Sequence, residues 1–394
     1  MKRILVITAR FPLPALGACE QDRFEGIKAL KRLGFEVSVI AKVFSFQPKE
    51  EIERFSREFG IPVKTLPYEN KFSLKRILSP LYWDGAAYEY SHASVKDAVE
   101  SEIKHFQPDL IWVDYTYLWP LYSIFKKRKI PVITRSINFE PAHFLQEDGY
   151  SPLNLIKFLS KLAGELITIK NSGFLFAITP NEEKIYRKLG AKSISILPLR
   201  GLPEFLDKRV LLRDRKVLNV IFMGSTYTVS HNRAALKAIL EDIAPAALEK
   251  CGGCFKFYIS GRKVPAEFEK FFGGNIVYAW HKDRKEFDEF LKDMDIAIVP
   301  SLYGAGMQQK IFEPLCRGIP TAASLRGLAG YPFLHRKHLL AAKNIAEFAD
   351  LLLELRDLKL RKTLSENSVE LARKLFSREV VDKTVVNAVN LCAR

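Results

Sequence analysis

The amino-acid sequence predicts two α/β domains in tandem, each built on a doubly wound parallel sheet. The chain has 394 residues, which suits two domains of about 150–200 residues better than one. Short apolar, β-branched segments alternate with longer amphipathic ones, a rhythm typical of a parallel sheet covered by helices on both faces. The alternation breaks around residues 199–216, where the sequence is charged and turn-rich, and then restarts.

The first run of this alternation predicts an N-terminal domain over residues 1–200. Its apolar segments predict strands at 3–8, 36–43, 109–115, 131–136 and 174–179. Amphipathic segments predict helices between them, among others at 22–34 and 93–106.

The second run predicts a C-terminal domain over residues 215–375. Strands are expected at 219–224, 255–261, 275–280, 295–301 and 320–324, with helices at 232–248, 285–294 and 310–318. Residues 200–215 form the expected linker. The last segment, 376–394, reads as a helix without a following strand, and we expect it to return and pack on the N-terminal domain.

Composition narrows the function. With 48% hydrophobic and 12% aromatic residues the chain can bury two full cores, and its formal charge of +16 favours an anionic partner. Nucleic acid, an anionic membrane surface and a phosphate-bearing small molecule all fit this charge. No nucleic-acid-binding motif is present, so no nucleic acid partner is expected.

Cysteine usage and the N-terminus indicate a cytoplasmic protein. Of five cysteines, only Cys251 and Cys254 form a C-x-x-C, and no second pair completes a zinc site, so a glycine-rich turn between reduced cysteines is expected. The apolar run near the start is only six residues long and is closed by Arg10 and two prolines, which is too short for a secretory signal. No run approaches the length of a membrane span.

Three predicted strand ends in the second domain carry glycines, and two of them add a cation. Glycine lets a backbone approach a ligand closely, although a glycine at a strand–helix turn is often only structural. Because strand ends of a parallel sheet meet at one edge, the three together favour an anionic ligand. The residues concerned are Gly224, Ser225, His231 and Asn232 after the first strand, Gly261 and Arg262 after the second, and Gly304, Gly306 and Lys310 after the fourth.

The segment GAGMQQKIFEPLCRG, from Gly304 to Gly318, is the most informative of these loops. A helix starting near Gln308 would direct its N-terminal N–H groups at an anion, with Lys310 in its first turn. Glu313 lies three residues further on the same face. The ammonium group suits a phosphate and the carboxylate suits ribose hydroxyls, whereas a surface ion pair is the alternative. The apolar sequence around both residues favours the first interpretation.

Motifs of other nucleotide-binding enzymes are absent. G-x-G-x-x-G does not follow the first strand, and G-x-x-x-x-G-K-[ST] occurs nowhere. The seven histidines show no metal-type pairing. We therefore expect neither a bound cofactor nor a metal ion.

These segments resemble the GT-B glycosyltransferases, in particular the retaining family-4 type (glycosyl transferases group 1). The strongest likeness is DIAIVPSLYGAGMQQKIFEPLCRGIPTAAS, residues 295–324. FMGSTYTVSHNRAALKAIL and ISGRKVP resemble donor-side loops of the family. FPLPALGACEQDRFEGIKALKRLGFEVSVI is similar to the opening of its acceptor domain.

The resemblance implies two Rossmann-like domains facing a cleft, and metal-independent transfer of a sugar from a nucleotide diphosphate-sugar with retention of configuration. Lys310 would neutralise the diphosphate and Glu313 would bind the ribose. By the same resemblance the donor is bound by residues of all three loops, namely Gly224, Ser225, His231, Asn232, Gly261, Arg262, Gly304, Ala305, Gly306, Met307, Lys310 and Glu313. Gly17, Asp22 and Glu140 are the expected acceptor-binding residues.

Two positions depart from the family. A glutamate eight positions before Glu313 is common in the family, and Ala305 stands there. In ITRSINFEPAHF the family histidine falls on Ile137, whereas Asn138 and Glu140 persist. Asn138 and His143 are therefore the further catalytic candidates, with a structural histidine as the alternative for His143.

The family resemblance also suggests an acceptor, a lipid-linked or cell-surface glycan. Residues 71–83 and 155–170 combine cations with large apolar side chains, and KKRK occupies 126–129. Both longer segments would suit peripheral contact with the inner face of a membrane, or else amphipathic helices packed on the sheet. Two other functions fit the same fold: a nucleotide-sugar epimerase, and a sugar-nucleotide-binding protein without transferase activity.

Overall fold

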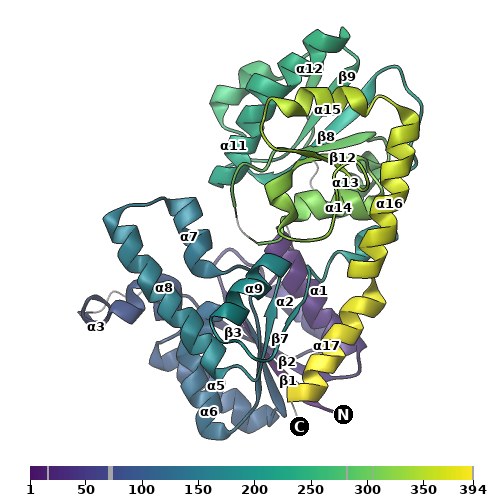
Figure 1. The fold of residues 1–394 in the computed structure, drawn as a ribbon. Helices are drawn as coiled ribbons and strands as arrows, with labels where there is room; N and C mark the ends of the chain where they lie inside the picture. Colours follow the sequence, from purple (N-terminus) through teal and green to yellow (C-terminus); the bar gives the residue numbers. More distant parts are fainter. Residues whose placement is uncertain (16, 70–73, 281–282, 305, 393–394) are drawn as a thin grey trace. The chain divides into compact units, whose positions relative to one another are not determined.

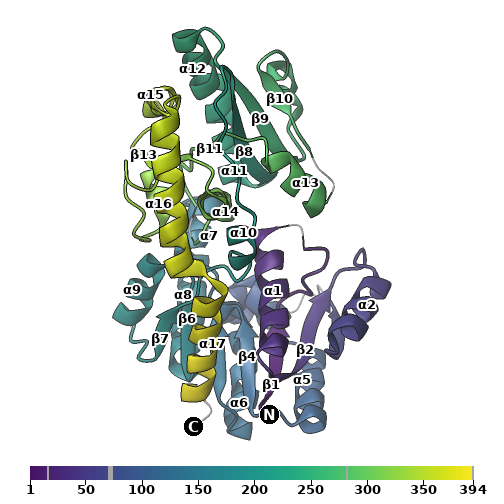
Figure 2. The same cartoon turned by 90° about the vertical axis from the view of Figure 1, so that its right-hand side faces the viewer.

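The computed structural model describes residues 1–15, 17–69, 74–280, 283–304 and 306–392. The chain forms two compact units, each with its own parallel sheet and covering helices (Figures 1 and 2). Unit 1 comprises Met1–Gly201, Ala305–Met307 and Val381–Arg394. Unit 2 comprises Leu202–Gly304 and Gln308–Val380.

The sheet of unit 1 has seven parallel strands in the order β3-β2-β1-β4-β5-β6-β7. Its central strands are buried on both faces, which explains their continuous apolar sequences. The sequence did not reveal β3 and β7, because these strands at the edges of the sheet are short and only partly buried. The strands are β1 (Arg3–Thr8), β2 (Glu36–Val43), β3 (Val63–Pro67), β4 (Leu110–Asp114), β5 (Val132–Arg135), β6 (Phe174–Ala177) and β7 (Ile194–Ile196).

Helices connect these strands and cover the sheet of unit 1. The α-helices are α1 (Ala18–Arg32), α2 (Lys49–Phe59), α3 (Leu74–Leu78), α4 (Gly85–Glu89), α5 (Ala93–Phe106), α6 (Tyr122–Arg128), α7 (Glu140–Asp148), α8 (Pro152–Asn171), α9 (Pro180–Lys188) and α17 (Arg378–Cys392). Two 3₁₀ turns are η1 (Pro80–Trp83) and η2 (Thr116–Leu121).

The last helix, α17, contributes to the core of unit 1. Its buried residues Val381, Val385 and Val389 belong to the same hydrophobic cluster as residues of β1, β2 and β4. At its start, Asp382 accepts a hydrogen bond of 2.6 Å from Arg32 of α1. The valines recur at four-residue spacing, so one face of the helix is buried.

Unit 2 has six parallel strands in the order β10-β9-β8-β11-β12-β13. The strands are β8 (Leu218–Thr226), β9 (Phe255–Arg262), β10 (Ile276–Tyr278), β11 (Ile296–Val299), β12 (Thr321–Ser324) and β13 (Leu340–Ala342). Its helices are α10 (Pro203–Leu206), α11 (Ser230–Ala238), η3 (Ile239–Ile243), α12 (Ala244–Cys251), η4 (Ala266–Phe271), α13 (Arg284–Leu291), α14 (Gln309–Arg317), η5 (Leu325–Leu328), α15 (Glu347–Glu354) and α16 (Leu358–Phe376). In Figure 1, α12 and α15 lie on one face of this sheet and α14 lies on the other.

Part of the expected linker is folded into unit 2. The short helix α10 buries Phe205 and Leu206, and the guanidinium groups of Arg284 and Arg317 lie 4.7 and 5.1 Å from the centre of the Phe205 ring. Cation–π contact and burial therefore hold residues 203–206 in place. Residues 209–215 have no regular secondary structure.

The expectation of reduced cysteines at the C-x-x-C is wrong. Cys251 and Cys254 form a disulfide with an S–S distance of 2.11 Å. The glycine-rich turn is present: Gly252 and Gly253 have φ values of +64° and +89°, a backbone conformation that glycine adopts without strain. This turn brings the two sulfur atoms together between α12 and β9.

Candidate functional site

The carboxyl ends of three strands of unit 2 carry the predicted loops. Strands β9, β8 and β11 are neighbours in the sheet, so the loops that follow them lie along the same edge. Ligands of open α/β sheets bind at this edge.

Lys310 joins two of the three loops. Its ammonium group donates a hydrogen bond of 2.8 Å to Asn232 Oδ1 and lies 5.7 Å from the centre of the Phe222 ring. The Asn232 side-chain amide in turn donates to Ser225 Oγ at 3.0 Å and to the carbonyl of Thr226 at 3.1 Å. Because Asn232 is only 3% exposed, it fixes the ammonium group beside the end of β8.

The N-terminus of α14 lies next to this lysine. Its first turn follows Gln308, the N-cap residue, whose own side chain makes no capping hydrogen bond. Ser301 donates a 2.8 Å hydrogen bond to Gln308 Oε1 and so fixes the preceding loop. Gly304 has a φ of +111°, and a Cβ atom there would lie 3.8 Å from the His231 ring. His231, Gly304 and Lys310 are therefore close together, and the helix end offers N–H groups to an anion.

Packing explains why glycine stands at positions 224 and 261, and the sequence did not reveal this. A Cβ atom on Gly224 would approach the hydroxyl of Tyr227 to 2.3 Å, and one on Gly261 would approach the Tyr227 ring to 2.7 Å. Tyr227 is 1% exposed and donates a 2.6 Å hydrogen bond to the carbonyl of Ser260. Both glycines make room for this tyrosine across the ends of β8 and β9, which accounts for them without a ligand.

Arg262, Gly306 and Met307 are the remaining described donor-side candidates. The Arg262 guanidinium lies 5.8 Å from the centre of the Trp280 ring. Gly306 has a φ of +71°, and Met307 is buried. Ala305 lies outside the described residues.

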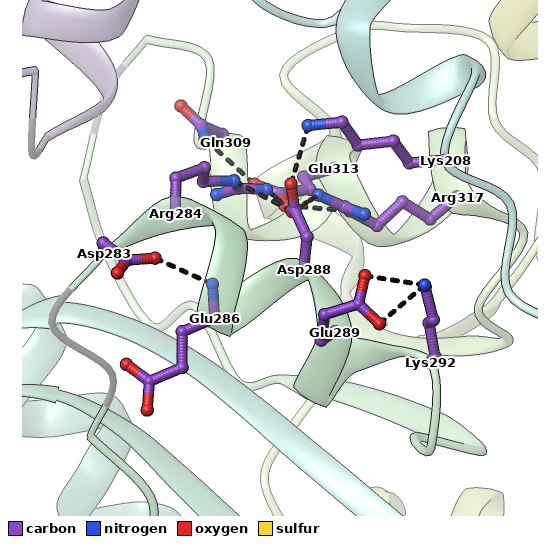
Figure 3. A network of polar contacts seen from close by, with 10 residues as sticks. All are labelled: Lys208, Asp283, Arg284, Glu286, Asp288, Glu289, Lys292, Gln309, Glu313 and Arg317. Atoms are coloured by element: carbon purple, nitrogen blue, oxygen red, sulfur yellow. Dashed lines mark hydrogen bonds and ion pairs between the residues drawn. The ribbon is translucent and has the colours of Figure 1, made fainter.

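Glu313 is the centre of an ion-pair network (Figure 3). Its carboxylate accepts hydrogen bonds from Arg284, from Arg317 Nε at 2.9 Å and from Gln309 Nε2 at 2.9 Å. Asp288 joins the two arginines to Lys208, which donates to it at 2.6 Å. Lys310 and Glu313 thus have different partners, which argues against the surface ion pair.

Burial by itself would raise the pKa of the Glu313 carboxyl, but Arg284 and Arg317 outweigh it and lower the pKa. Glu313 is therefore a carboxylate at neutral pH, yet only 3% of the residue is exposed. The prediction that it binds ribose hydroxyls remains a prediction. Arg284 and Arg317 were not singled out from the sequence, although Glu313 and Arg317 stand at the four-residue spacing of a helical ion pair.

Asp22 is an expected residue for binding the sugar acceptor in unit 1, but its carboxylate is paired with two arginines. Its two carboxylate oxygens accept hydrogen bonds from Arg135 and Arg200 at 2.8–3.0 Å, and the residue is 1% exposed. Burial by itself would raise the pKa of this carboxyl, but the two arginines hold it well below its usual range. Asp22 therefore supports the edge of the sheet. This geometry does not favour direct contact between Asp22 and a sugar acceptor.

The other candidates of unit 1 lie at helix starts. Gly17 directly precedes α1. Asn138 lies in the loop between β5 and α7, where its carbonyl accepts a 2.8 Å hydrogen bond from Ser136 Oγ. Glu140 is the first residue of α7, and His143 lies one turn further. Burial lowers the pKa of His143, whose Nδ1 is buried without a hydrogen-bond partner among the described residues.

Two buried carboxyl groups, Glu165 and Glu182, lie at this loop together with the partly exposed Glu140. Glu165 accepts hydrogen bonds from Thr116 Oγ1, the Glu140 N–H and Tyr186 Oη at 2.8–3.2 Å, and Glu182 accepts one of 2.9 Å from the Phe139 N–H. Burial raises the pKa of Glu165 to about 8, and those of Glu140 and Glu182 to about 7. The folded unit thus keeps these protons at pH values where an unfolded chain loses them.

This arrangement predicts that unit 1 loses stability as pH rises. A carboxyl group with a raised folded-state pKa stabilises fully below its unfolded value of 4.5 and loses that contribution as pH passes 7–8. The midpoint temperature of thermal unfolding should fall between about pH 5 and pH 9. In Glu165→Gln this fall should be smaller by roughly a third. Glu100→Gln, at a partly exposed carboxylate, should leave the profile unchanged; an unchanged profile for Glu165→Gln as well would contradict the assignment.

Among the residues that the structure describes, no group of three or more His, Cys, Asp or Glu side chains is placed to hold a metal ion.

Comparison with known proteins relates unit 2 to one family and the whole chain to one fold. Residues 218–357 match the model of the family Glycosyl transferases group 1. No curated sequence matches the chain significantly. The chain has the GT-B fold of solved glycosyltransferases, as the following three structures show.

Sucrose-phosphate synthase from Thermosynechococcus elongatus aligns with a TM-score of 0.71 at 13% identity, covering 99% of this chain and 98% of that one. A UDP-forming α,α-trehalose-phosphate synthase from Burkholderia xenovorans aligns with a TM-score of 0.68 at 12% identity, covering 100% of both chains. Anabaena HepE, solved in complex with UDP and glucose, aligns with a TM-score of 0.66 at 11% identity, covering 99% of this chain and 100% of that one.

Proposed function

From the group 1 glycosyltransferase match of residues 218–357 and the GT-B fold of the chain, we propose that this protein is a glycosyltransferase. It transfers a sugar from a nucleotide diphosphate-sugar to an acceptor, with retention of configuration at the anomeric carbon. A UDP-sugar is the donor to test first, because HepE was solved with UDP and glucose.

One observation carries this proposal. Asn232 holds the ammonium group of Lys310 beside the N-terminus of α14, at the carboxyl edge of the unit 2 sheet. A fixed cation and a set of N–H groups at one edge suit the two phosphates of a nucleoside diphosphate.

The same groups explain how the reaction is accelerated. The diphosphate gains negative charge as its bond to the sugar breaks, so a cation fixed at that point stabilises the transition state more than the ground state. Lys310, the α14 N-terminus and Arg262 supply this positive charge, and the reaction then proceeds without a metal ion.

Glu313 is proposed as the ribose ligand. To bind it, a ribose hydroxyl must replace one of the donors that now hydrogen-bond to the carboxylate. Oε1 accepts from Arg284 and Arg317, and Oε2 accepts from Gln309 at 2.9 Å and from Arg284 at 3.4 Å. Gln309 is the group that a ribose hydroxyl can replace at lowest cost, because Arg284 and Arg317 keep the carboxylate charged and in place.

The acceptor is proposed to bind at unit 1, near Gly17, Asn138, Glu140 and His143, and to be a lipid-linked or cell-surface glycan. The identity of the acceptor is tested by measuring which acceptor molecules receive the sugar. Donor binding does not test it. The protein is proposed to act in the cytoplasm.

Calorimetry with nucleoside diphosphates tests the donor assignment. We expect UDP to bind and to raise the unfolding temperature by mass action, with GDP and ADP at matched concentration as controls for base preference. Absence of binding by all three would contradict the assignment.

Turnover of a bound sugar nucleotide separates the alternatives. A transferase releases nucleoside diphosphate together with free or transferred sugar. An epimerase would convert the donor into another sugar nucleotide without release, and a binding protein would show affinity without turnover.

A further inference from the structure

Helix α8 in unit 1 has its polarity inverted. Four residues of this 20-residue helix are buried, and none of them is a large apolar residue: Ser160, Gly164, Glu165 and Thr168. A helix that packs only against its own domain buries an apolar stripe and exposes polar residues. Here the fully buried residues are polar or small, while Leu162 and Ile169 pack partly buried against a hydrophobic cluster.

Hydrogen bonds satisfy this buried polar face. Ser160 Oγ donates to the Leu81 carbonyl at 2.9 Å, and Thr168 Oγ1 donates to the Thr116 carbonyl at 3.0 Å. Glu165 accepts from Thr116 Oγ1 at 2.8 Å. A Cβ atom on Gly164 would lie 2.8 Å from the Trp119 ring, so the helix packs closely at this point. The orientation of α8 is thus fixed by specific contacts.

The outward face of α8 is apolar. The exposed large apolar residues of α8 are Leu153 (57% exposed), Leu155 (48%), Ile156 (43%), Leu159 (62%) and Leu166 (44%). All but Leu153 lie within about one third of the helix circumference, given 100° per residue. Next to them, η1 contacts both α8 and the short helix α3, whose Leu74 and Leu78 are 72% and 79% exposed. Figure 1 shows α3 and α8 on the same side of unit 1. A contiguous apolar surface of this size marks an interaction site.

The exposed charge of α8 itself is positive. The only acidic residue of α8, Glu165, is 1% exposed and faces the protein. Lys170, in the last turn of α8, is exposed, and Lys157, in the second turn, is partly exposed. The chain carries a net charge of +16. We call the outward residues of α3 and α8, together with these lysines, the α8 surface.

We propose that the α8 surface docks on an anionic lipid membrane, with α8 lying in the plane of the interface. Leucines flanked by lysines suit this position, because the apolar side chains enter the acyl region while the ammonium groups meet phosphate groups. A second copy of the chain suits it less, because a two-fold contact would bring the lysines of both copies together. None of the described helices is long and apolar enough to cross a bilayer, so the contact is peripheral.

Part of this surface was anticipated from residues 71–83 and 155–170. Residues 71–73 of the first segment lie outside the described residues. The alternative, an amphipathic helix packed on the sheet, holds for part of α8, because Leu162 and Ile169 pack partly buried against a cluster that includes Leu175 of β6. It does not account for the exposed apolar residues on the outward face.

Vesicle co-sedimentation of the full-length protein tests the proposal. The protein should bind vesicles of phosphatidylcholine and phosphatidylglycerol, and binding should weaken with added salt and with phosphatidylcholine alone. Leu155→Ser/Leu159→Ser should weaken binding by roughly tenfold for each leucine removed. Leu211→Ser in unit 2, at an 81% exposed leucine, is the matched control and should bind like the unaltered protein.

Two results would overturn the proposal. One is the absence of binding to anionic vesicles, or equal binding by the double variant whose melting curve shows that it is folded. The other is a dimer, seen by sedimentation velocity, that the double variant dissociates. Donor binding measured on the same samples keeps this test separate from the proposed transfer activity.

Discussion

Lys310→Ala is expected to weaken UDP binding and to lower kcat/KM for sugar transfer by about a hundredfold or more. Loss of one fixed donor at a developing negative charge typically costs 10²–10³ in rate. Lys310 is such a donor, because Asn232 fixes its ammonium group at 2.8 Å. The measurements are calorimetry with UDP and steady-state kinetics with the best donor.

Matched variants identify the cause. Lys292→Ala removes an exposed lysine of unit 2 that pairs with Glu289 on the surface, and should leave both quantities unchanged. Asn232→Ala should lower kcat/KM less than Lys310→Ala, because it frees the ammonium group without removing it. Unchanged UDP affinity in a folded Lys310→Ala protein would refute the role given to this lysine.

Asp22→Ala is expected to destabilise unit 1 by about 3–5 kcal/mol. The variant would leave Arg135 and Arg200 buried without their common carboxylate, and both are almost fully enclosed, at 0% and 5% exposed. The loss in the free energy of unfolding is measured by equilibrium unfolding in urea, with hydrogen exchange used to monitor unit 1. Because the folded-state pKa of Asp22 is lowered, its contribution is present above its unfolded pKa and is lost as pH falls further.

Asp109→Ala is the control for this variant. Asp109 pairs with Arg3 at the surface of the same unit, so little loss is expected. Asp22→Ala could instead unfold like the unaltered protein and raise KM for the acceptor. That result would support the direct acceptor contact expected from the sequence and contradict the structural role.

Much of the site could be predicted because its information is local. Lys310 lies in the first turn of a helix after a buried strand, and both facts can be read from apolar runs and glycines. The partners of Glu313 could be predicted only in part. Arg317 is one helical turn away, but Arg284 lies 29 residues earlier on α13, and no pattern in the sequence marks that contact.

The sequence by itself determined the two parallel α/β sheets, the order of their main elements and the loop that carries Lys310. These follow from periodicity and turn chemistry, which act over a few residues. Only the tertiary structure decided that Asp22 is held between two arginines, that Gly224 and Gly261 make room for Tyr227, and that the apolar face of α8 points outward. Each of these depends on side chains that meet across elements far apart in the chain, and the charge or size of one residue does not specify its partner.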